Sequence, residues 1–319
     1  MKDVAQLAHD VIEQVGSVIV GKDDQVGLLL VALLTEGHVV IDDVPGVAKT
    51  LLVKTLAAAL GLKFTRVQCT PDLLPGDVTG SEVFNQKTAA FEFRPGPVFA
   101  NFVLADEINR ATPRTQSSFL EAMEERQVTV EGAAHPLPRP FLVMATQNPV
   151  ELKGTFPLPE AQLDRFLMKL RLGYPTQAEE VRMLARFRNA EPLADVRAVA
   201  SVDDILAARD AAREVHVSDD IESYIVAIVR ATRETPTLTL GASPRAALML
   251  MHAAQARAVL AGRDFVTPDD VAALAAPVLA HRLLLARDAL IEQRDPAAVV
   301  AGVLAGIAAP VEEAGGRRA

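Results

Sequence analysis

One stretch of eight residues constrains the fold of this chain more than any other. It reads Asp43-Val44-Pro45-Gly46-Val47-Ala48-Lys49-Thr50, follows an apolar run at 38–42, and leads into residues 51–60, whose composition predicts a helix. A strand, a tight turn, Lys-Thr and a helix form the layout of a phosphate-binding loop, in which backbone N–H groups at a helix N-terminus face an anion. The stretch therefore predicts an α/β fold with an anion site after its first strand. The alternative is an ordinary strand–turn–helix.

The side chains of this stretch fit a nucleotide triphosphate and its metal. We expect Lys49 to reach the β- and γ-phosphates and the hydroxyl of Thr50 to bind Mg²⁺. The rest of the cradle would come from Val44, Pro45, Gly46, Val47, Ala48 and Leu51. The strict pattern has Gly where Asp43 and Ala48 stand. Ala48 suits the loop if its φ is negative, and Asp43 suits it if its carboxylate points away from the phosphates.

A second element predicts what happens to the bound nucleotide. Residues 101–107 form an apolar strand that ends in two carboxylates, Asp106 and Glu107. The first suits Mg²⁺ through water, and the second suits the orientation or deprotonation of an attacking water. An acidic pair at a strand end is common, but downstream of a phosphate loop in an alternating α/β pattern it indicates nucleotide hydrolysis.

Composition narrows the class of protein. The chain has 319 residues, enough for two domains, and a formal net charge of −9, which gives no electrostatic case for nucleic acid or an anionic membrane. Its single cysteine, Cys69, permits no intrachain disulfide and indicates a reducing compartment, and residues 1–3 show no signal-peptide pattern. We therefore expect a cytoplasmic protein. Residues 296–311 are apolar but too short to span a bilayer, so we expect a buried final helix there.

The pattern along the chain predicts a parallel sheet followed by a helical region. Strand candidates lie at 38–42, 63–69, 101–106, 141–146 and 168–172, with helical patterns between them. Hairpin insertions are predicted at 81–84 with 91–94 and at 127–131 with 134–137. Helices are predicted at 176–188, 202–216, 218–234, 243–262, 267–287 and 295–309. We expect a nucleotide-binding core over 1–189, a helical domain over 190–311, and a disordered tail over 312–319.

Four further segments carry candidate polar groups. Asn148 follows the strand expected beside the phosphate loop, where an amide can sense the γ-phosphate; the alternative is a local cap. Arg165 stands just before the last strand, where it can face the nucleotide of an adjacent subunit; the alternative is a surface ion pair. Arg245 projects from the first turn of a helix that Ser243 and Pro244 open. Val20 and Gly21 precede the core, where their backbone can meet adenine.

These segments together resemble the MoxR family of AAA+ ATPases over nearly the whole chain. The resemblance rests on Gly37-His38, Val44-Pro45-Gly46-Val47-Ala48-Lys49-Thr50, Asp106-Glu107-Ile108-Asn109-Arg110-Ala111, Ala145-Thr146-Gln147-Asn148-Pro149, Phe156-Pro157-Leu158-Pro159-Glu160-Ala161-Gln162-Leu163-Asp164-Arg165-Phe166, Gly241-Ala242-Ser243-Pro244-Arg245 and His281-Arg282-Leu283. Ala48 also occurs in the family, whereas Asp43 departs from the Gly that the family favours.

The resemblance implies a fold and a set of roles. The fold is a five-stranded AAA+ core with a helical lid and two β-hairpin insertions, one in helix 2 and one before the sensor-1 strand. The cofactors are ATP and Mg²⁺, with the metal held at Thr50 and Asp106. By position, Lys49 and Thr50 match Walker A, Asp106 and Glu107 Walker B, Asn148 sensor 1, Arg165 the arginine finger and Arg245 sensor 2; whether Arg245 acts in cis or in trans stays open.

The same resemblance implies an assembly and a task. Family members act as chaperone-like remodellers of client complexes, as nucleotide-dependent and hexameric rings, often with a partner that carries a von Willebrand factor A domain. Two alternatives remain. A nucleic-acid-stimulated motor is disfavoured by the acidic charge, and a non-enzymatic scaffold is disfavoured by the joint presence of Glu107, Asn148 and Arg165.

Overall fold

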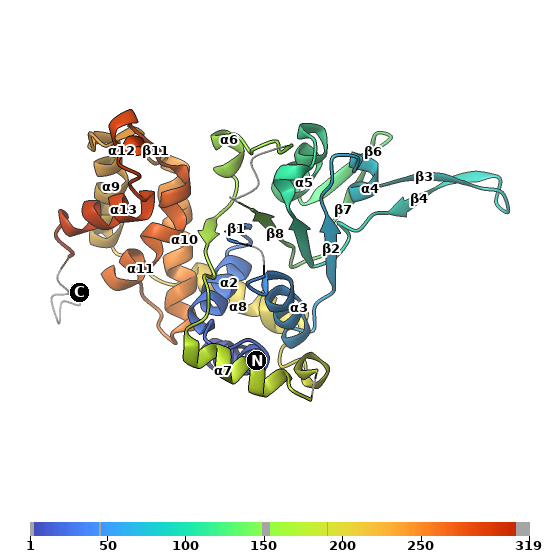
Figure 1. The fold of residues 1–319 in the computed structure, drawn as a ribbon, viewed down its shortest axis with the longest axis horizontal. Coiled ribbons are helices and arrows are strands. Elements are labelled where there is room, and N and C mark those ends of the chain that lie inside the picture. Colours follow the sequence, from blue (N-terminus) through green and yellow to red (C-terminus); the bar gives the residue numbers. More distant parts are fainter. Residues whose placement is uncertain (1–2, 45, 149–153, 190, 311–319) are drawn as a thin grey trace, which may run out of the picture. The chain divides into compact units, whose positions relative to one another are not determined.

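The computed structural model describes residues 3–44, 46–148, 154–189 and 191–310 (Figure 1). Its internal contacts divide the chain into two compact units, Met1–Asp210 and Ala211–Ala319. The division falls within helix α8 (Val202–Glu214). The boundary at 189/190 expected from the sequence stays a prediction, and the expected tail over 312–319 lies outside the described residues.

A five-stranded parallel sheet forms the centre of the first unit. Its order is β2-β5-β8-β1-β9, so the first strand is flanked by the fourth and the fifth of the sheet. This confirms the five strands that the sequence predicts. The strands are β1 (Val39–Asp42), β2 (Phe64–Gln68), β5 (Phe102–Asp106), β8 (Leu142–Gln147) and β9 (Met168–Leu170). Because all five run parallel, the polar residues that follow β1, β5 and β8 meet at one edge of the sheet.

Helices cover both faces of this sheet, as strand alternation requires. Val40, Val103 and Val143 point into a core that also holds Phe119 and Leu120 of α5. Their neighbours in the strands, such as Ile41 and Leu104, are equally buried on the opposite face, where α3 contacts β2 and β5. The helices concerned are α1 (Val4–Gly16), α2 (Asp23–Leu34), α3 (Lys49–Ala59), α4 (Pro75–Thr79) and α5 (Pro113–Glu125).

Both predicted hairpins are present. The first is formed by β3 (Gly80–Asn85) and β4 (Ala90–Pro95), and it extends well away from the sheet (Figure 1). Near its end Phe84 and Phe91 contact edge to face, and both are largely exposed. The second, β6 (Gln127–Val130) with β7 (Ala133–Pro136), contacts the first through a stacked pair, Phe93 and His135, whose ring centroids lie 3.8 Å apart.

The chain leaves the sheet through short elements. Helix α6 (Glu160–Leu163) and β9 are followed by α7 (Gln177–Phe187) and a 3₁₀ turn, η2 (Pro192–Asp195). Another 3₁₀ turn, η1 (Ile108–Arg110), follows β5 directly. Because β9 runs parallel to β1, the residues before β9 lie at the amino end of β1, where Leu167 bonds to His38, and the residues after it lie at the carboxyl end, beside Asp43.

The second unit is helical, with one short β pair that sequence patterns did not predict. A single helix was expected over 267–287, but α11 ends at Leu279. Pro277 removes a backbone donor in its last turn, and Arg282 donates to the carbonyl of Val278. The elements are α9 (Asp219–Glu234), β10 (Leu238–Leu240), α10 (Pro244–Leu260), α11 (Pro268–Leu279), η3 (Ala280–Arg282), β11 (Leu284–Leu285), α12 (Arg287–Ile291) and α13 (Pro296–Ala305). β10 and β11 pair antiparallel.

The final helix differs from the expectation of a buried element. It ends at Ala305, and Val300 is its one fully buried residue. Its other described residues are at least partly exposed, and α13 packs mainly against α9, α11 and η3. Among the described residues, no helix combines the length and the apolar character needed to cross a bilayer.

Candidate active site

The predicted phosphate loop lies at the carboxyl edge of the sheet, between β1 and α3. Gly46 has φ +90° and Ala48 has φ 59° and ψ 27°, so both adopt left-handed backbone. The condition that the sequence set for Ala48, a negative φ, is therefore not met. A Cβ in this region costs roughly 1 kcal/mol or more, and the loop retains that strain where the strict pattern has Gly. Pro45 lies outside the described residues.

The carboxylate of Asp43 points into the protein rather than into the loop. Its Oδ2 accepts hydrogen bonds from the backbone N–H of Leu172 at 2.6 Å and of Gly173 at 2.7 Å. Its Oδ1 accepts from the N–H of Val44 at 2.9 Å. Asp43 is 8% exposed. The residue that departs from the usual pattern thus ties the start of the loop to the chain segment that follows β9, which meets the condition set by the sequence.

The lysine of the loop is held over the loop backbone. Nζ of Lys49 donates to the carbonyl oxygen of Asp43 at 2.6 Å. Lys49 is the first residue of α3, and its amine and the first N–H groups of that helix lie at the same end of the element. A cation above a turn of left-handed residues at a helix N-terminus is a site that favours an anion.

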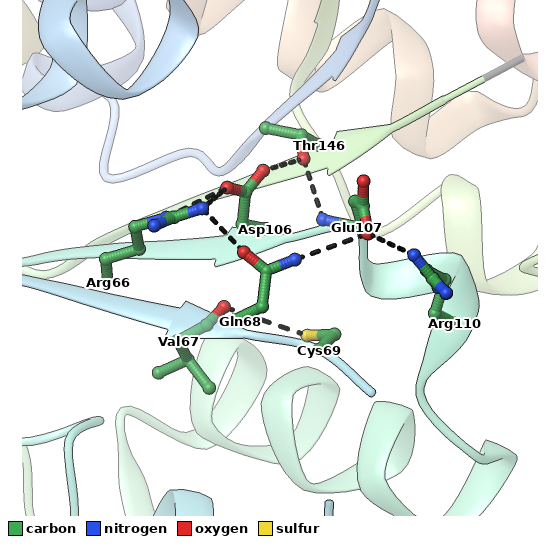
Figure 2. A network of polar contacts seen from close by, with 8 residues as sticks. All are labelled: Arg66, Val67, Gln68, Cys69, Asp106, Glu107, Arg110 and Thr146. Carbon is green, nitrogen blue, oxygen red and sulfur yellow. Dashed lines mark hydrogen bonds and ion pairs between the residues drawn. The ribbon is translucent and has the colours of Figure 1, made fainter. Parts of the chain in front are cut away.

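Two carboxylates stand at the end of β5, which β8 separates from β1, and a threonine of β8 joins them (Figure 2). The hydroxyl of Thr146 donates to Oδ1 of Asp106 at 2.6 Å and accepts from the N–H of Glu107 at 2.8 Å. Glu107 has φ 56°, a left-handed conformation that turns the chain sharply out of the strand into η1. The hydroxyl of Thr146 thus holds the carboxylate of Asp106 and the backbone of Glu107 at the point where the chain turns out of the strand.

Two arginines and a glutamine complete this network (Figure 2). Arg66 donates from Nε at 2.9 Å and from Nη2 at 2.7 Å to Oδ2 of Asp106. Oε2 of Glu107 accepts from Nη1 of Arg110 at 3.0 Å and from the amide of Gln68 at 3.3 Å. Each carboxylate therefore has a guanidinium counterion supplied by a different element, β2 for Asp106 and η1 for Glu107.

Cys69 lies beside these carboxylates but takes no part in the chemistry. It is fully buried and unpaired, and burial first, then the charges of Asp106 and Glu107, raise the pKa of its thiol to about 12. The thiol stays protonated at neutral pH, so it is neither a nucleophile nor a metal ligand there.

Residues 20–22 lie near the same segment that Asp43 holds. Nζ of Lys22 donates to the carbonyl of Leu172 at 2.7 Å. Gly21 has φ +69°, a left-handed conformation that favours glycine, and Oε1 of Glu179 lies 1.8 Å from where a Cβ would stand. Val20 and Gly21, the predicted adenine contacts, are thus placed against α7 and the end of β9 within the first unit. Their role toward a base stays a prediction.

The other predicted site residues lie on three elements. Asn148 follows β8 and is 8% exposed. Nη1 of Arg165 forms an ion pair with Oε2 of Glu124 at 3.1 Å, which matches the alternative of a surface pair and leaves the finger role open. Arg245 is in the first turn of α10, which Ser243 caps by accepting from the N–H of Ala246. Arg245 belongs to the second unit, whereas Lys49 belongs to the first.

The donor atoms suit Mg²⁺. Among the described residues no cluster of three or more His, Cys, Asp or Glu side chains forms a metal cage. The hydroxyl of Thr50 and the carboxylate of Asp106 are hard oxygen ligands, and Mg²⁺ bound with a nucleotide draws its remaining ligands from phosphates and water. The two residues thus fit a Mg²⁺ ion that is bound together with a nucleotide.

Sequence reasoning missed several residues that shape this site. They are Arg66, Gln68, Arg110, Thr146 and Glu124, together with the backbone of Leu172 and Gly173. Thr146 stood within a recognised segment, and its position two residues before Asn148 was a usable signal. Arg110 also stood within a recognised segment, three residues after Glu107. The others depend on which strands and helices become neighbours.

Comparisons with known proteins agree with this geometry. Residues 38–168 match the family model described as the ATPase family associated with various cellular activities (AAA), and residues 230–303 match the AAA lid domain. The chain is 45% identical to Chaperone MoxR1 of Mycobacterium tuberculosis, over 94% of this chain and 81% of that protein. It is 49% identical to the protein YeaC of Bacillus subtilis, over 98% and 97%. A crystal structure from Cytophaga hutchinsonii superposes with a TM-score of 0.90 at 40% identity, covering 97% and 96%.

Proposed function

The chain belongs to the MoxR family of AAA+ ATPases, and from this premise we propose that it hydrolyses ATP at the loop of residues 43–50 and uses the hydrolysis to remodel client protein complexes. The name of the mycobacterial relative describes a chaperone. The observation that carries the proposal is the meeting of the loop, the carboxylates of Asp106 and Glu107, and Asn148 at the carboxyl ends of three adjacent strands.

Each residue at this edge has a role in the proposal. Lys49 neutralises the β- and γ-phosphates, and Glu107 accepts the proton of the attacking water or orients it. Asn148 places an amide at the end of the adjacent strand, where it can hold that water or the γ-phosphate. Thr50 and Asp106 would hold Mg²⁺, which supplies charge neutralisation for the phosphate oxygens when it is bound.

Assembly is the second part of the proposal. Arg165 follows α6 on the far side of β1 from β5, and it pairs with α5 rather than with the loop. A guanidinium placed there serves the nucleotide of an adjacent subunit better than its own, so we assign it as a finger in trans within a nucleotide-dependent, hexameric ring. We assign to Arg245 the sensing of a phosphate. We also propose that the partner of this chain is a protein with a von Willebrand factor A domain. The buried, unpaired Cys69 supports a reducing, cytoplasmic compartment.

ATP binding and hydrolysis can be separated by two substitutions. Lys49→Ala removes the side-chain cation of the cradle and should weaken ATP binding sharply in a calorimetric titration. Glu107→Gln keeps the shape of the side chain and removes the base, so it should bind ATP and fail to release phosphate. Near-native affinity of Lys49→Ala would show that the loop is not the nucleotide site. Wild-type turnover of Glu107→Gln would move the base elsewhere.

Mixing two inactive variants tests action in trans. Arg165→Ala should bind ATP and lack turnover, since each subunit keeps its own cradle. Mixed with Lys49→Ala, it should regain part of the activity, because some interfaces then join an intact loop to an intact finger. Mixed rings that form, as shown by mass photometry, but stay inactive would count against the trans assignment. Stimulation of turnover by DNA, measured in parallel, would favour a nucleic-acid motor instead.

A further inference from the structure

The ion pair between Arg165 and Glu124 joins two elements that are distant in the sequence and held close by the fold. Nη1 of Arg165 lies 3.1 Å from Oε2 of Glu124, and the two side chains are 34% and 32% exposed. Glu124 lies in the last turn of α5, and Arg165 lies between α6 and β9. The pair therefore lies at the surface, where a group that serves a neighbouring subunit must be.

His38 forms hydrogen bonds to both of the backbone segments that carry this ion pair. Nε2 of His38 donates to the carbonyl of Met123, the residue before Glu124, at 3.0 Å. Nδ1 accepts from the N–H of Val143 at 3.0 Å, which fixes the neutral tautomer with the proton on Nε2. The backbone carbonyl of His38 accepts from the N–H of Leu167, two residues after Arg165, at 2.7 Å. The backbone beside Glu124 is thus bound to the ring of His38, and the backbone beside Arg165 is bound to the carbonyl of the same residue.

Close packing around His38 also restrains the two segments that carry the ion pair. A Cβ on Gly37 would lie 2.5 Å from Cβ of Leu167, so glycine is what permits this approach. Phe166, next to Arg165, is fully buried. Behind Glu124, Arg126 pairs with Glu36 at 2.7 Å, and Arg209 pairs with the same carboxylate at 2.6 Å. The helix end that carries Glu124 is therefore anchored on two sides.

We propose that Glu124 is a positioning residue that holds Arg165 in the orientation it needs as a finger for the adjacent subunit. The inference rests on the proposed function and adds a residue to it. Among the described residues, Glu124 is the one ionic partner of Arg165, and the atoms of the pair are Oε2 and Nη1. The five N–H donors of arginine leave the rest of the fork for phosphate oxygens.

Such an ion pair orients the guanidinium of Arg165 and does not keep it from binding a phosphate. A half-exposed ion pair contributes little binding strength, so it does not withhold the guanidinium from a phosphate. It does restrict the rotamers of a long side chain, and a side chain that is already ordered loses less entropy when it meets the transition state. Removal of the carboxylate should therefore slow the chemical step and leave nucleotide affinity unchanged.

Turnover measurements on the full chain test the inference. Glu124→Ala and Glu124→Gln should each lower kcat about two- to fivefold, the most that an exposed ion pair can supply by ordering a side chain and a part of the roughly 10³–10⁵ that a finger contributes, while KM for ATP changes less than twofold. Glu125→Gln is the matched control, because it makes the same charge change on the next, exposed residue of α5 and should keep full activity. Nucleotide-dependent assembly, followed by sedimentation, should be the same for all four proteins.

A double-mutant cycle tests the role of Glu124 separately from the role of Arg165 as a finger. If Glu124 acts through Arg165, then Glu124→Ala adds no further loss to Arg165→Ala in single-turnover phosphate release. A loss of the same factor in both backgrounds, unchanged kcat in Glu124→Ala, or a raised kcat would each overturn the positioning role while the finger assignment stands. Full activity of Arg165→Ala itself would overturn the finger assignment, and the role of Glu124 with it.

Discussion

Acidification should weaken the sheet of the first unit through His38. Its ring is buried at 4% exposure, and burial chiefly, with the charge of Arg126, lowers its pKa from 6.5 to about 4, against a raising contribution from the hydrogen bond to Met123. Because the folded pKa lies below the unfolded one, the unfolded chain binds the proton more readily. The neutral ring thus contributes its full stabilisation above pH 6.5, and that contribution is lost as the pH falls toward 4.

The two pKa values set the size of the effect. The interval from 6.5 to about 4 corresponds to about 3 kcal/mol when His38 is protonated in both states, at 1.36 kcal/mol for each pH unit. Between pH 7.5 and pH 5 the loss is about 2 kcal/mol, since the folded ring is still mostly neutral at pH 5. That free energy equals a change of about 30-fold in the equilibrium between the closed and open sheet.

Hydrogen–deuterium exchange of β1 and β8 is the suitable assay, because it reports on the strands next to His38. A probe of the whole chain would mix in the second unit, where burial also lowers the pKa of His252. Protection factors, corrected for the intrinsic pH dependence of exchange, should fall about 30-fold from pH 7.5 to pH 5 through this residue. His38→Gln should lack that component and keep whatever other groups contribute. Equal pH dependence in wild type and variant would refute the assignment to His38.

Three further substitutions test the loop and the carboxylates. Asp43→Ala should destabilise the first unit by about 2–4 kcal/mol, because it leaves the buried N–H groups of Leu172 and Gly173 without their charged acceptor; an unchanged urea midpoint would contradict this. Ala48→Gly should relieve the left-handed strain and stabilise by about 1 kcal/mol, read as a higher Tm; a lower Tm would show that the strain is absent. Thr146→Val should cost about 1–3 kcal/mol and slow ATP turnover, whereas Thr146→Ser, which keeps the hydroxyl, should do neither; equal behaviour of the two would exclude the hydroxyl bridge.

The network around the two carboxylates also explains how two acids are tolerated at one strand end. Asp106 and Glu107 would repel each other without counterions, and Arg66 and Arg110 supply one each. In the proposed function, a nucleotide and its metal would change the charge that these guanidinium groups face. Arg66 is half exposed, so its pairing with Asp106 is weak enough to be exchanged for other contacts.

The sequence alone determined the class of fold, the order of its strands along the chain, and the residues that we propose to touch phosphate. These are local properties: Lys49 and Thr50 sit next to a turn and a helix start, and Asp106 and Glu107 end an apolar run. A residue's neighbours within a few positions fix such features. Their places next to predicted strands and at a helix start also marked Asn148, Arg165 and Arg245, and the resemblance to a family gave them named roles, which remain proposals.

Only the tertiary structure decided which groups support those residues. Asp43 looked like a defect in the loop until the N–H groups of Leu172 and Gly173, which are distant in sequence, were seen to hold its carboxylate. Arg165 acquired Glu124 as a partner because α5 and the segment before β9 both fasten to His38. Hydrogen bonds between residues far apart in sequence depend on strand order and on how helices pack. No periodicity or local motif encodes those distances, so they follow from the fold as a whole.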